Sequence, residues 1–274
     1  IIFAWILSGK KGKLFVTEHN PLTYEISQYS KLKEFILRFI FALSYRNATG
    51  ISTVSKGIKN NLTKLAFINK NKIKVIYNPV AIGNNKIKQL FNFKEKLWNS
   101  KYSTKLLSVG NLKFQKNHKL LINAFSKLPK NLNSQLIIIG DGPYRKELEH
   151  LINNLKLSKR ILLIGHKNNP YPWYNSADLF ILSSNYEGFG NVLVEALECG
   201  LPIVSTNCFC GPKEILENGK YGKLVEVNNV NDLKNGIIEQ LNKKHDKKKL
   251  IQRSQDFLIS KISDEYLSFF KTKK

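Results

Sequence analysis

Methionine is absent from this chain of 274 residues, and not even an initiator stands at its start. We therefore expect a fragment that begins inside a domain. Cysteine is scarce too, since the three present are too few for a disulfide framework and no further Cys/His pair completes a zinc site. Cys199, Cys208 and Cys210 are expected to be small thiols in a reducing compartment.

Long hydrophobic runs are also missing. The longest run near the start, residues 1–9, is too short to span a bilayer, and no signal peptide is visible. These absences favour a cytoplasmic protein.

Acidic residues are few: 20 Asp and Glu stand against 44 Lys and Arg, which gives a formal net charge of +24. Abundant lysine, asparagine and isoleucine are what an AT-rich genome produces, and this accounts for part of the charge. The alternative is an anionic partner, such as a sugar nucleotide, a phospholipid surface or nucleic acid. Nucleic acid is least favoured, because the sequence has no zinc-finger spacing, RNP-like aromatic motif or basic heptad region.

Apolar strands alternate with helical stretches along most of the chain, which predicts the α/β class. In the second part, strands are expected at 104–110, 134–142, 160–166, 178–184, 201–207 and 221–227, with helices at 118–128, 143–155, 169–176, 190–199, 211–218 and 230–243. In the first part, strands are expected at 13–19, 51–55 and 72–80, with a helix at 30–45. Apolar strands separated by helices predict parallel sheets covered on both faces, as in doubly wound Rossmann-like domains.

Ligands of such sheets bind beyond the carboxyl ends of the strands, and the segment 183–206 carries unusual chemistry there. Gly188 and Gly190 let backbone N–H groups approach a ligand, and the helix that begins near Asn191 offers its positive end to a phosphate. Glu187 and Glu195 flank this anion site, where a carboxylate is electrostatically unhelpful. We therefore expect the two glutamates to accept hydrogen bonds from sugar hydroxyls.

The spacing of these two glutamates, E-x7-E within EGFGNVLVEALECGLPIVST, resembles the signature of retaining GT-B glycosyltransferases of family four. The resemblance runs from about Leu14 to Val227. It implies two Rossmann-like doubly wound domains facing a cleft, the first of them incomplete here. It also implies that Glu187 contacts the donor sugar and Glu195 the ribose.

The resemblance extends to domain bounds. Residues 1–88 are expected to form a partial acceptor-side domain, 89–103 a linker and 104–257 the nucleotide-sugar domain. Residues 258–274 are expected to form a helix that packs back on the first domain.

Basic residues of the segment 106–125 are similar to those with which the family holds the donor diphosphate. Lys116 matches the family lysine. In the family an arginine often follows the glycine that matches Gly110, and here this position is Asn111. Lys113 is expected to supply the second positive charge instead. A lysine does not grip a phosphate bidentately as arginine does.

Shorter matches add further positions. GDGP at 140–143 and the loop at 164–174 resemble segments near the nucleotide, and His19 and Ser55 resemble first-domain positions. The predicted catalytic residues are Glu187, Lys116 and His19. The predicted donor-binding residues are Gly110, Asn111, Lys113, Lys116, Gly142, His166, Lys167, Glu187, Gly188, Phe189, Gly190, Asn191, Val192, Leu193 and Glu195.

The function that the resemblance implies is transfer of a hexose or N-acetylhexosamine from a UDP-sugar, with retention, to a saccharide or polyprenyl-phosphate-linked acceptor. STNCFCGPKEIL at 205–216 is similar to members that build bacterial surface glycans such as lipopolysaccharide. No cofactor and no metal are expected. The alternatives are a GT-B epimerase or sugar synthase and, in a different class, a non-catalytic basic protein that binds nucleic acid or membranes.

An apolar stripe runs along the stretch 29–47: Leu32, Phe35, Ile36, Phe39, Ile40 and Leu43 recur at helical spacing. This spacing predicts the core face of a Rossmann helix. Because Lys31, Lys33, Arg38 and Arg46 surround the stripe, we also expect salt-sensitive contact with the inner face of the cytoplasmic membrane, without insertion.

Overall fold

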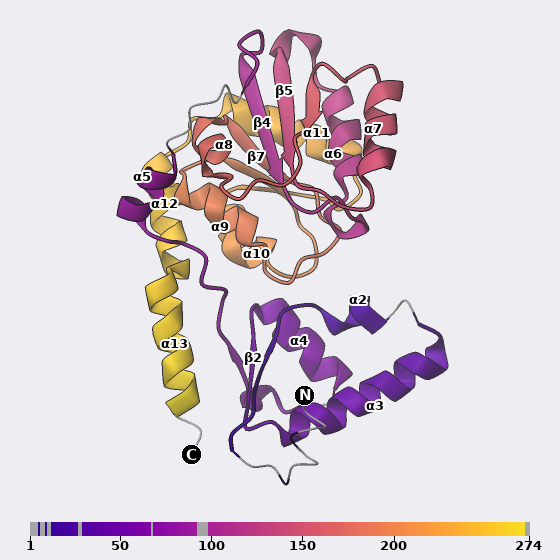
Figure 1. The fold of residues 1–274 in the computed structure, drawn as a ribbon, viewed down its shortest axis with the longest axis vertical. Helices are drawn as coiled ribbons and strands as arrows, with labels where there is room; N and C mark the ends of the chain where they lie inside the picture. The colour runs from indigo at the N-terminus through magenta and orange to yellow at the C-terminus, as the bar shows by residue number, and fades with distance from the viewer. Residues whose placement is uncertain are drawn as a thin grey trace. The chain divides into compact units, whose positions relative to one another are not determined.

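The computed structural model describes residues 5, 9, 12–26, 29–66, 68–91 and 98–271. Its chain forms two compact units (Figure 1). Among the described residues, unit 1 contains those up to Pro79, the short segment Glu187–Phe189 and those from Ile259 onward. Unit 2 contains Val80–Tyr186 and Gly190–Leu258.

Unit 2 is built on a six-stranded parallel sheet in the order β6-β5-β4-β7-β8-β9. Its strands are β4 (Thr104–Val109), β5 (Ser134–Ile139), β6 (Ile161–Leu163), β7 (Leu179–Leu182), β8 (Ile203–Thr206) and β9 (Lys223–Val225). Every residue of β5, β7 and β8 is buried, as expected of strands covered on both faces.

The helices of unit 2 follow the strands in alternation. They are α5 (Asn84–Leu90), α6 (His118–Ser126), α7 (Arg145–Asn154), α8 (Tyr171–Ser176), α9 (Asn191–Glu198), α10 (Pro212–Ile215), α11 (Val230–Asn242) and α12 (Lys247–Ser254). One group, α6, α7 and α11, packs its apolar residues with the sheet in one hydrophobic core, and α8, α10 and α12 contact α9 (Figure 1). The predicted α/β architecture with parallel sheets is confirmed.

The strand order fixes where a ligand is expected. From β4 the chain builds outward through β5 and β6, then returns to pair β7 with the opposite side of β4. The switch point therefore lies between β4 and β7, and the loops that follow these two strands meet there.

Unit 1 holds a three-stranded parallel sheet in the order β1-β2-β3. Its strands are β1 (Phe15–Glu18), β2 (Gly50–Thr53) and β3 (Ile73–Val75), and its helices are α2 (Leu22–Ile26), α3 (Lys31–Asn47), α4 (Lys56–Leu65) and α13 (Ile259–Lys271). The ring of Phe15 packs edge-on against Phe269 at 5.3 Å, and a side chain at Gly50 would collide with both rings. This contact joins α13 to β1 and β2 within the unit.

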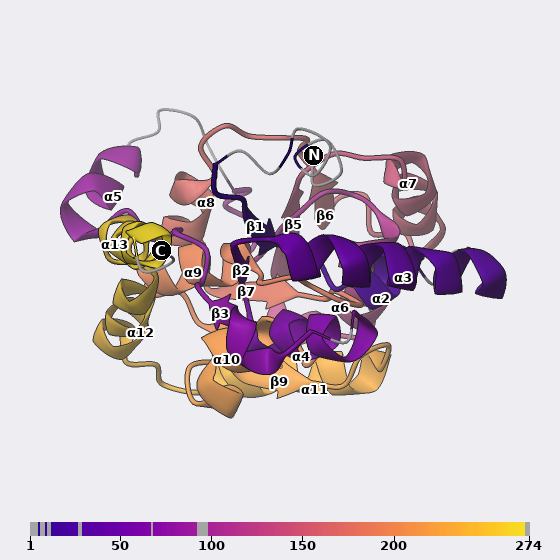
Figure 2. The same ribbon diagram turned by 90° about the horizontal axis from the view of Figure 1, so that it is seen from below.

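The expectation that the apolar stripe of α3 faces the core is wrong. Leu32, Phe35 and Phe39 are 72%, 70% and 60% exposed. The core instead takes Ala42 and Tyr45 as buried residues, with Leu37 and Phe41 packed against them. The helix KLKEFILRFIFALSYRN is apolar around most of its circumference, so its spacing alone does not select the buried face. Figure 2 shows α3 along its length.

The helix α5 was not predicted from the sequence, and it overlaps the start of the predicted linker. The predicted linker 89–103 falls partly on residues 92–97, which lie outside the described residues. In the part of the chain that the structure describes, none of the helices combines the length and apolarity needed to cross a bilayer.

Candidate active site

The loop after β4 is held in place by the loop after β5. Gly110 N–H donates to the Ile139 carbonyl at 2.9 Å, and Leu112 N–H donates to the Asp141 carbonyl at 2.9 Å. A side chain at Gly140 would collide with the Gly110 carbonyl, and one at Gly142 would meet the Leu112 backbone. The GDGP turn therefore shapes the predicted diphosphate loop by close backbone packing.

Lys116 lies at the end of this loop, in the turn Phe114–Lys116. Its methylene groups pack over Gly110, where an added Cβ would lie 3.3 Å from Lys116 Cγ. The Ser183 hydroxyl, just after β7, donates to the Lys116 carbonyl at 2.9 Å. The lysine is thus fixed at the switch point between β4 and β7.

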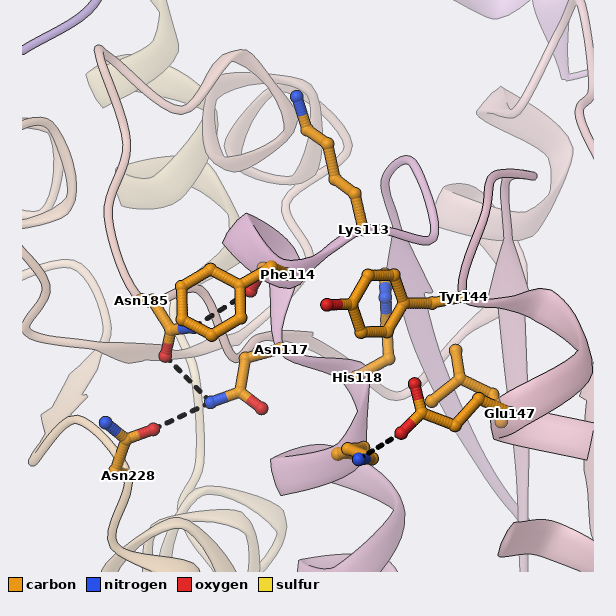
Figure 3. A pocket seen from close by; sticks show the side chains of 10 residues that line it. Lys113, Phe114, Asn117, His118, Tyr144, Glu147, Asn185 and Asn228 are labelled. Carbon is orange, nitrogen blue, oxygen red and sulfur yellow. Dashed lines mark hydrogen bonds and ion pairs between the residues drawn. The ribbon is translucent and has the colours of Figure 1, made fainter. Parts of the chain in front are cut away.

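Three asparagines tie together the loops that follow β4, β7 and β9 (Figure 3). Asn117 Nδ2 donates to Asn185 Oδ1 and to Asn228 Oδ1, both at 2.8 Å. Asn117 has a left-handed backbone with φ 44°, and its side chain caps α6. This amide network was not anticipated from the sequence, because its members lie 68 and 111 residues apart.

His118, the first residue of α6, borders a cavity of about 390 Å³ beside the same loop (Figure 3). Its ring is buried, and Nδ1 has no hydrogen-bond partner among the described residues. Burial lowers the pKa of His118 to about 3, and the nearby charge of Lys116 adds to the effect. The ring is therefore neutral at physiological pH.

The helix α9 starts at the same edge of the sheet. Gly190 precedes it with φ 99°, a conformation that favours glycine, and its carbonyl accepts the Leu193 N–H at 2.9 Å. This bond uses the Leu193 amide within the turn, and the Leu193 side chain is fully buried. Asn191 and Val192 form the rest of the first turn.

Glu195 lies one turn into α9 and receives a hydrogen bond from Tyr174 Oη to Oε2 at 2.8 Å. Burial raises the pKa of the Glu195 carboxyl, while the Tyr174 bond and the charge of Lys116 oppose the rise. Lys116 is therefore near enough to act on Glu195. The structure brings these two predicted residues to the same edge and adds Tyr174, which sequence reasoning missed.

His166 and Lys167 follow β6. His166 is exposed, and Lys167 Nζ lies 5.9 Å from the centroid of the Trp173 ring on α8. The Gly165 carbonyl accepts the Gly140 N–H at 2.9 Å, which places this loop beside the GDGP turn.

A second carboxylate on α9 was also missed. Glu198 is buried and accepts the Gly83 N–H at 2.7 Å, just before α5. No spacing in the sequence connects residues 115 positions apart. Its contact with the backbone indicates that Glu198 holds the start of α5 in place.

Within unit 1, the structure brings Glu187, Gly188 and Phe189 together with His19. A side chain at Gly188 would collide with the His19 carbonyl oxygen, so the two backbones touch. The Phe189 ring stacks on Tyr77 at 5.4 Å, and Glu187 is buried. His19 itself is exposed, immediately after β1.

Ser55 has a structural role in the same unit. Its hydroxyl accepts the Ile58 N–H at 3.2 Å and caps α4.

Among the described residues, no group of three His, Cys, Asp or Glu side chains is suited to hold a metal ion.

Comparison with protein families gives two matches that together span most of the chain. The model of glycosyl transferases group 1 matches residues 89–257, and that of glycosyltransferase family 4 matches residues 1–83.

Two relatives from Campylobacter jejuni are similar over nearly the whole chain. An N-acetylgalactosaminyltransferase named for a diacetylbacillosaminyl-diphospho-undecaprenol substrate is 33% identical, over 95% of this chain and 70% of its own. An α-1,4-N-acetyl-D-galactosaminyltransferase named for a related undecaprenol-linked glycan is 28% identical, over 94% of this chain and 68% of its own.

Among solved structures, Anabaena HepE in complex with UDP and glucose has a TM-score of 0.79 at 22% identity, covering 98% of this chain and 74% of HepE. This likeness supports the GT-B fold. With a family model matching more than half of its residues, the chain belongs to the glycosyl transferases group 1 family and is a glycosyltransferase.

Proposed function

We propose that this enzyme transfers a sugar from a UDP-sugar to a polyprenyl-diphosphate-linked or saccharide acceptor in surface-glycan synthesis, with retention at the anomeric carbon. The observation that carries the proposal is the meeting of Lys116, Glu195 and the first turn of α9 at the switch point of unit 2. The undecaprenol-linked substrates in the names of both relatives support the acceptor class, and HepE with UDP and glucose supports the donor.

In this proposal the diphosphate is bound by Lys116, with Lys113 as a second charge, and by the positive end of α9. These groups oppose the negative charge that develops on the departing diphosphate. Glu195 accepts hydrogen bonds from the ribose hydroxyls, and Tyr174 holds its carboxylate in position. The proposal uses no metal ion.

The transferred sugar passes through an oxocarbenium-like state, as in glycoside hydrolysis. Glu187, with His19 in the same unit, is proposed to contact that sugar. The acceptor hydroxyl attacks the anomeric carbon as the bond to the diphosphate breaks, and the departing phosphate takes the acceptor proton.

The test is a screen of UDP-, GDP- and ADP-sugars by thermal shift, followed by donor hydrolysis and transfer to a polyprenyl-diphosphate-linked sugar. We expect stabilisation by UDP and its sugars, and an NMR spectrum of the product with the anomeric configuration of the donor. An interconverted nucleotide sugar without transfer would indicate an epimerase. No stabilisation by any nucleotide would indicate a non-catalytic basic protein.

A further inference from the structure

We infer that the cavity beside the start of α6 is a second binding site of unit 2, which takes a neutral pyranose residue. Of the predicted donor-binding residues, Lys113 lines this cavity, whereas Lys116 and Glu195 do not. The inference deepens the proposed function and rests on it for the source of the sugar, which is the saccharide part of the acceptor.

The cavity has a volume of about 390 Å³ (Figure 3). Its walls come from the loop after β4, the first turns of α6 and α7, and the loops after β7 and β9. Small-molecule sites are typically pockets of about 300–1,000 Å³ in which a few polar groups converge among aromatic and apolar side chains. The cavity has this size and this mixed lining.

A buried nitrogen in the cavity wall has no partner. His118 is 3% exposed, and its Nδ1 has no hydrogen-bond partner among the described residues. Buried polar atoms in proteins are normally satisfied, so this one indicates a partner that comes from a ligand. Because burial lowers the pKa of His118 to about 3, the ring is neutral, and one of its nitrogens donates while the other accepts. A sugar hydroxyl can match either nitrogen, since it both donates and accepts.

Two aromatic side chains also line the cavity. Phe114 is 63% exposed in the loop after β4, and Tyr144 is half-buried at the start of α7 (Figure 3). A pyranose has a face of C–H groups that packs on an aromatic ring, while its hydroxyls point outward to polar groups. An exposed phenylalanine beside a cavity offers such a ring, and covering it with a sugar removes apolar surface from water.

The amides at the cavity are held in fixed positions and keep hydrogen-bonding capacity. Asn117 Nδ2 donates to Asn185 Oδ1 and to Asn228 Oδ1, and Asn185 Nδ2 donates to the Phe114 carbonyl at 2.8 Å. Asn228 uses its oxygen in this network, which leaves its two N–H groups for a ligand. Amide donors fixed before the ligand arrives lower the entropic cost of binding it.

The charges at the cavity disfavour an anionic ligand. Lys119 forms an ion pair with Glu147, so a carboxylate stands beside the one cation, and the buried His118 ring carries no charge. Lys113 is exposed and can turn toward solvent. A neutral ligand with many hydroxyls suits this mixture, because a hydroxyl donates to a carboxylate and accepts from an ammonium group.

The experiment is saturation-transfer NMR of the full chain with the methyl glycosides of glucose, galactose, N-acetylglucosamine and N-acetylgalactosamine, in the presence of saturating UDP. Adenosine and inorganic phosphate are added as competitors. The test variant is Phe114→Ala, which keeps the backbone carbonyl that Asn185 binds. The matched control is Phe209→Ala, which removes a 43% exposed ring from the loop after β8, outside the cavity lining.

We expect at least one glycoside to bind, Phe114→Ala to weaken its affinity roughly tenfold or more, and the control to bind as the wild type does. No saturation transfer to any glycoside, or equal affinity in Phe114→Ala, would overturn the inference. Displacement by adenosine or by phosphate would overturn it in favour of a nucleobase or an anion. Thermal shift with UDP tests the proposed function separately, because it does not depend on glycoside binding.

The buried imidazole gives a direct reading of the place of binding. Long-range ¹H–¹⁵N NMR observes the ring nitrogens of the histidines, and His118→Asn assigns those of His118. We expect the His118 resonances to shift when the glycoside binds, and those of His150, which is exposed on α7, to stay in place. Unmoved His118 resonances would place the sugar outside this cavity.

The link to the acceptor is tested by transfer kinetics. Phe114→Ala is expected to raise the KM for a saccharide acceptor about tenfold and to leave the KM for the UDP-sugar unchanged. An unchanged acceptor KM would overturn the assignment of the pocket to the acceptor.

Discussion

The Tyr174 hydroxyl donates a hydrogen bond to the Glu195 carboxylate across 2.8 Å, between α8 and α9. This bond favours the charged form of Glu195 and opposes the rise in pKa that burial causes. Tyr174 is itself buried, whereas Glu195 is partly exposed, so the tyrosine holds the carboxylate from the interior of unit 2. The carboxylate that we assign to the ribose is therefore oriented by a tyrosine from another helix.

Tyr174→Phe is expected to weaken UDP binding by about three- to tenfold, because one neutral-to-charged hydrogen bond is lost while the ring remains. It is also expected to raise the pKa of Glu195 further, so that UDP binding begins to fall at a higher pH on acidification. Calorimetry across pH 5–8 measures both effects. An unchanged affinity and pH profile would show that Tyr174 only fills space.

Lys116→Ala and Glu195→Ala are each expected to weaken UDP binding by about ten- to a hundredfold, or ~1.5–3 kcal/mol, since each loses a charge-assisted hydrogen bond. The control is Lys220→Ala, because Lys220 forms an exposed ion pair with Glu217 just before β9, at the opposite edge of the parallel sheet. Unchanged calorimetric affinity in both test variants would remove the donor-site assignment.

Glu187→Gln is expected to spare UDP binding and lower transfer, since its proposed partner is the sugar, which UDP lacks. The measurement compares UDP affinity by calorimetry with the rate of transfer from UDP-sugar. If affinity and rate fall together, Glu187 does not act on the sugar.

His118 is expected to make stability depend on pH. Its pKa is about 3 in the folded chain, against an ordinary value of 6.5, so the unfolded chain binds the extra proton between these values. The contribution of the neutral His118 ring to the free energy of unfolding is complete above pH 6.5 and is lost as pH falls toward 3. The loss amounts to about 2 kcal/mol between pH 7 and pH 5.

Urea unfolding at pH 7 and pH 5 measures this loss, which His118→Asn is expected to remove and His150→Asn, at an exposed histidine of α7, to retain. Glu195 and Glu198 have raised pKa values and therefore stabilise the fold as pH falls, in the opposite direction. Comparing the pH dependence of the wild type with that of His118→Asn separates the effect of His118 from the opposing effect of the two glutamates. An identical loss in His118→Asn would contradict a buried neutral imidazole.

The local pattern of the chain predicted the elements around the candidate site well. The runs at 104–110 and 134–142 contain β4 and β5, because residues in strands covered on both faces are apolar without alternation. The predicted start of a helix near Asn191 is likewise confirmed, and Gly190 before it has a positive φ, which glycine adopts readily. The helix α12 was missed, because its stretch KKKLIQRS has few apolar residues to show a period.

The sequence by itself determined the alternation of strands and helices, the parallel sheets and the glycines that shape the loops, because these depend on local period and backbone freedom. Tertiary structure decided which polar groups meet: Tyr174 with Glu195, and Asn117 with Asn185 and Asn228, contacts set by strand order rather than spacing. It also decided which face of α3 is buried. A helix apolar on two faces can bury either one, and the core of unit 1 accommodates the face with Ala42 and Tyr45, which leaves the phenylalanines Phe35 and Phe39 outside.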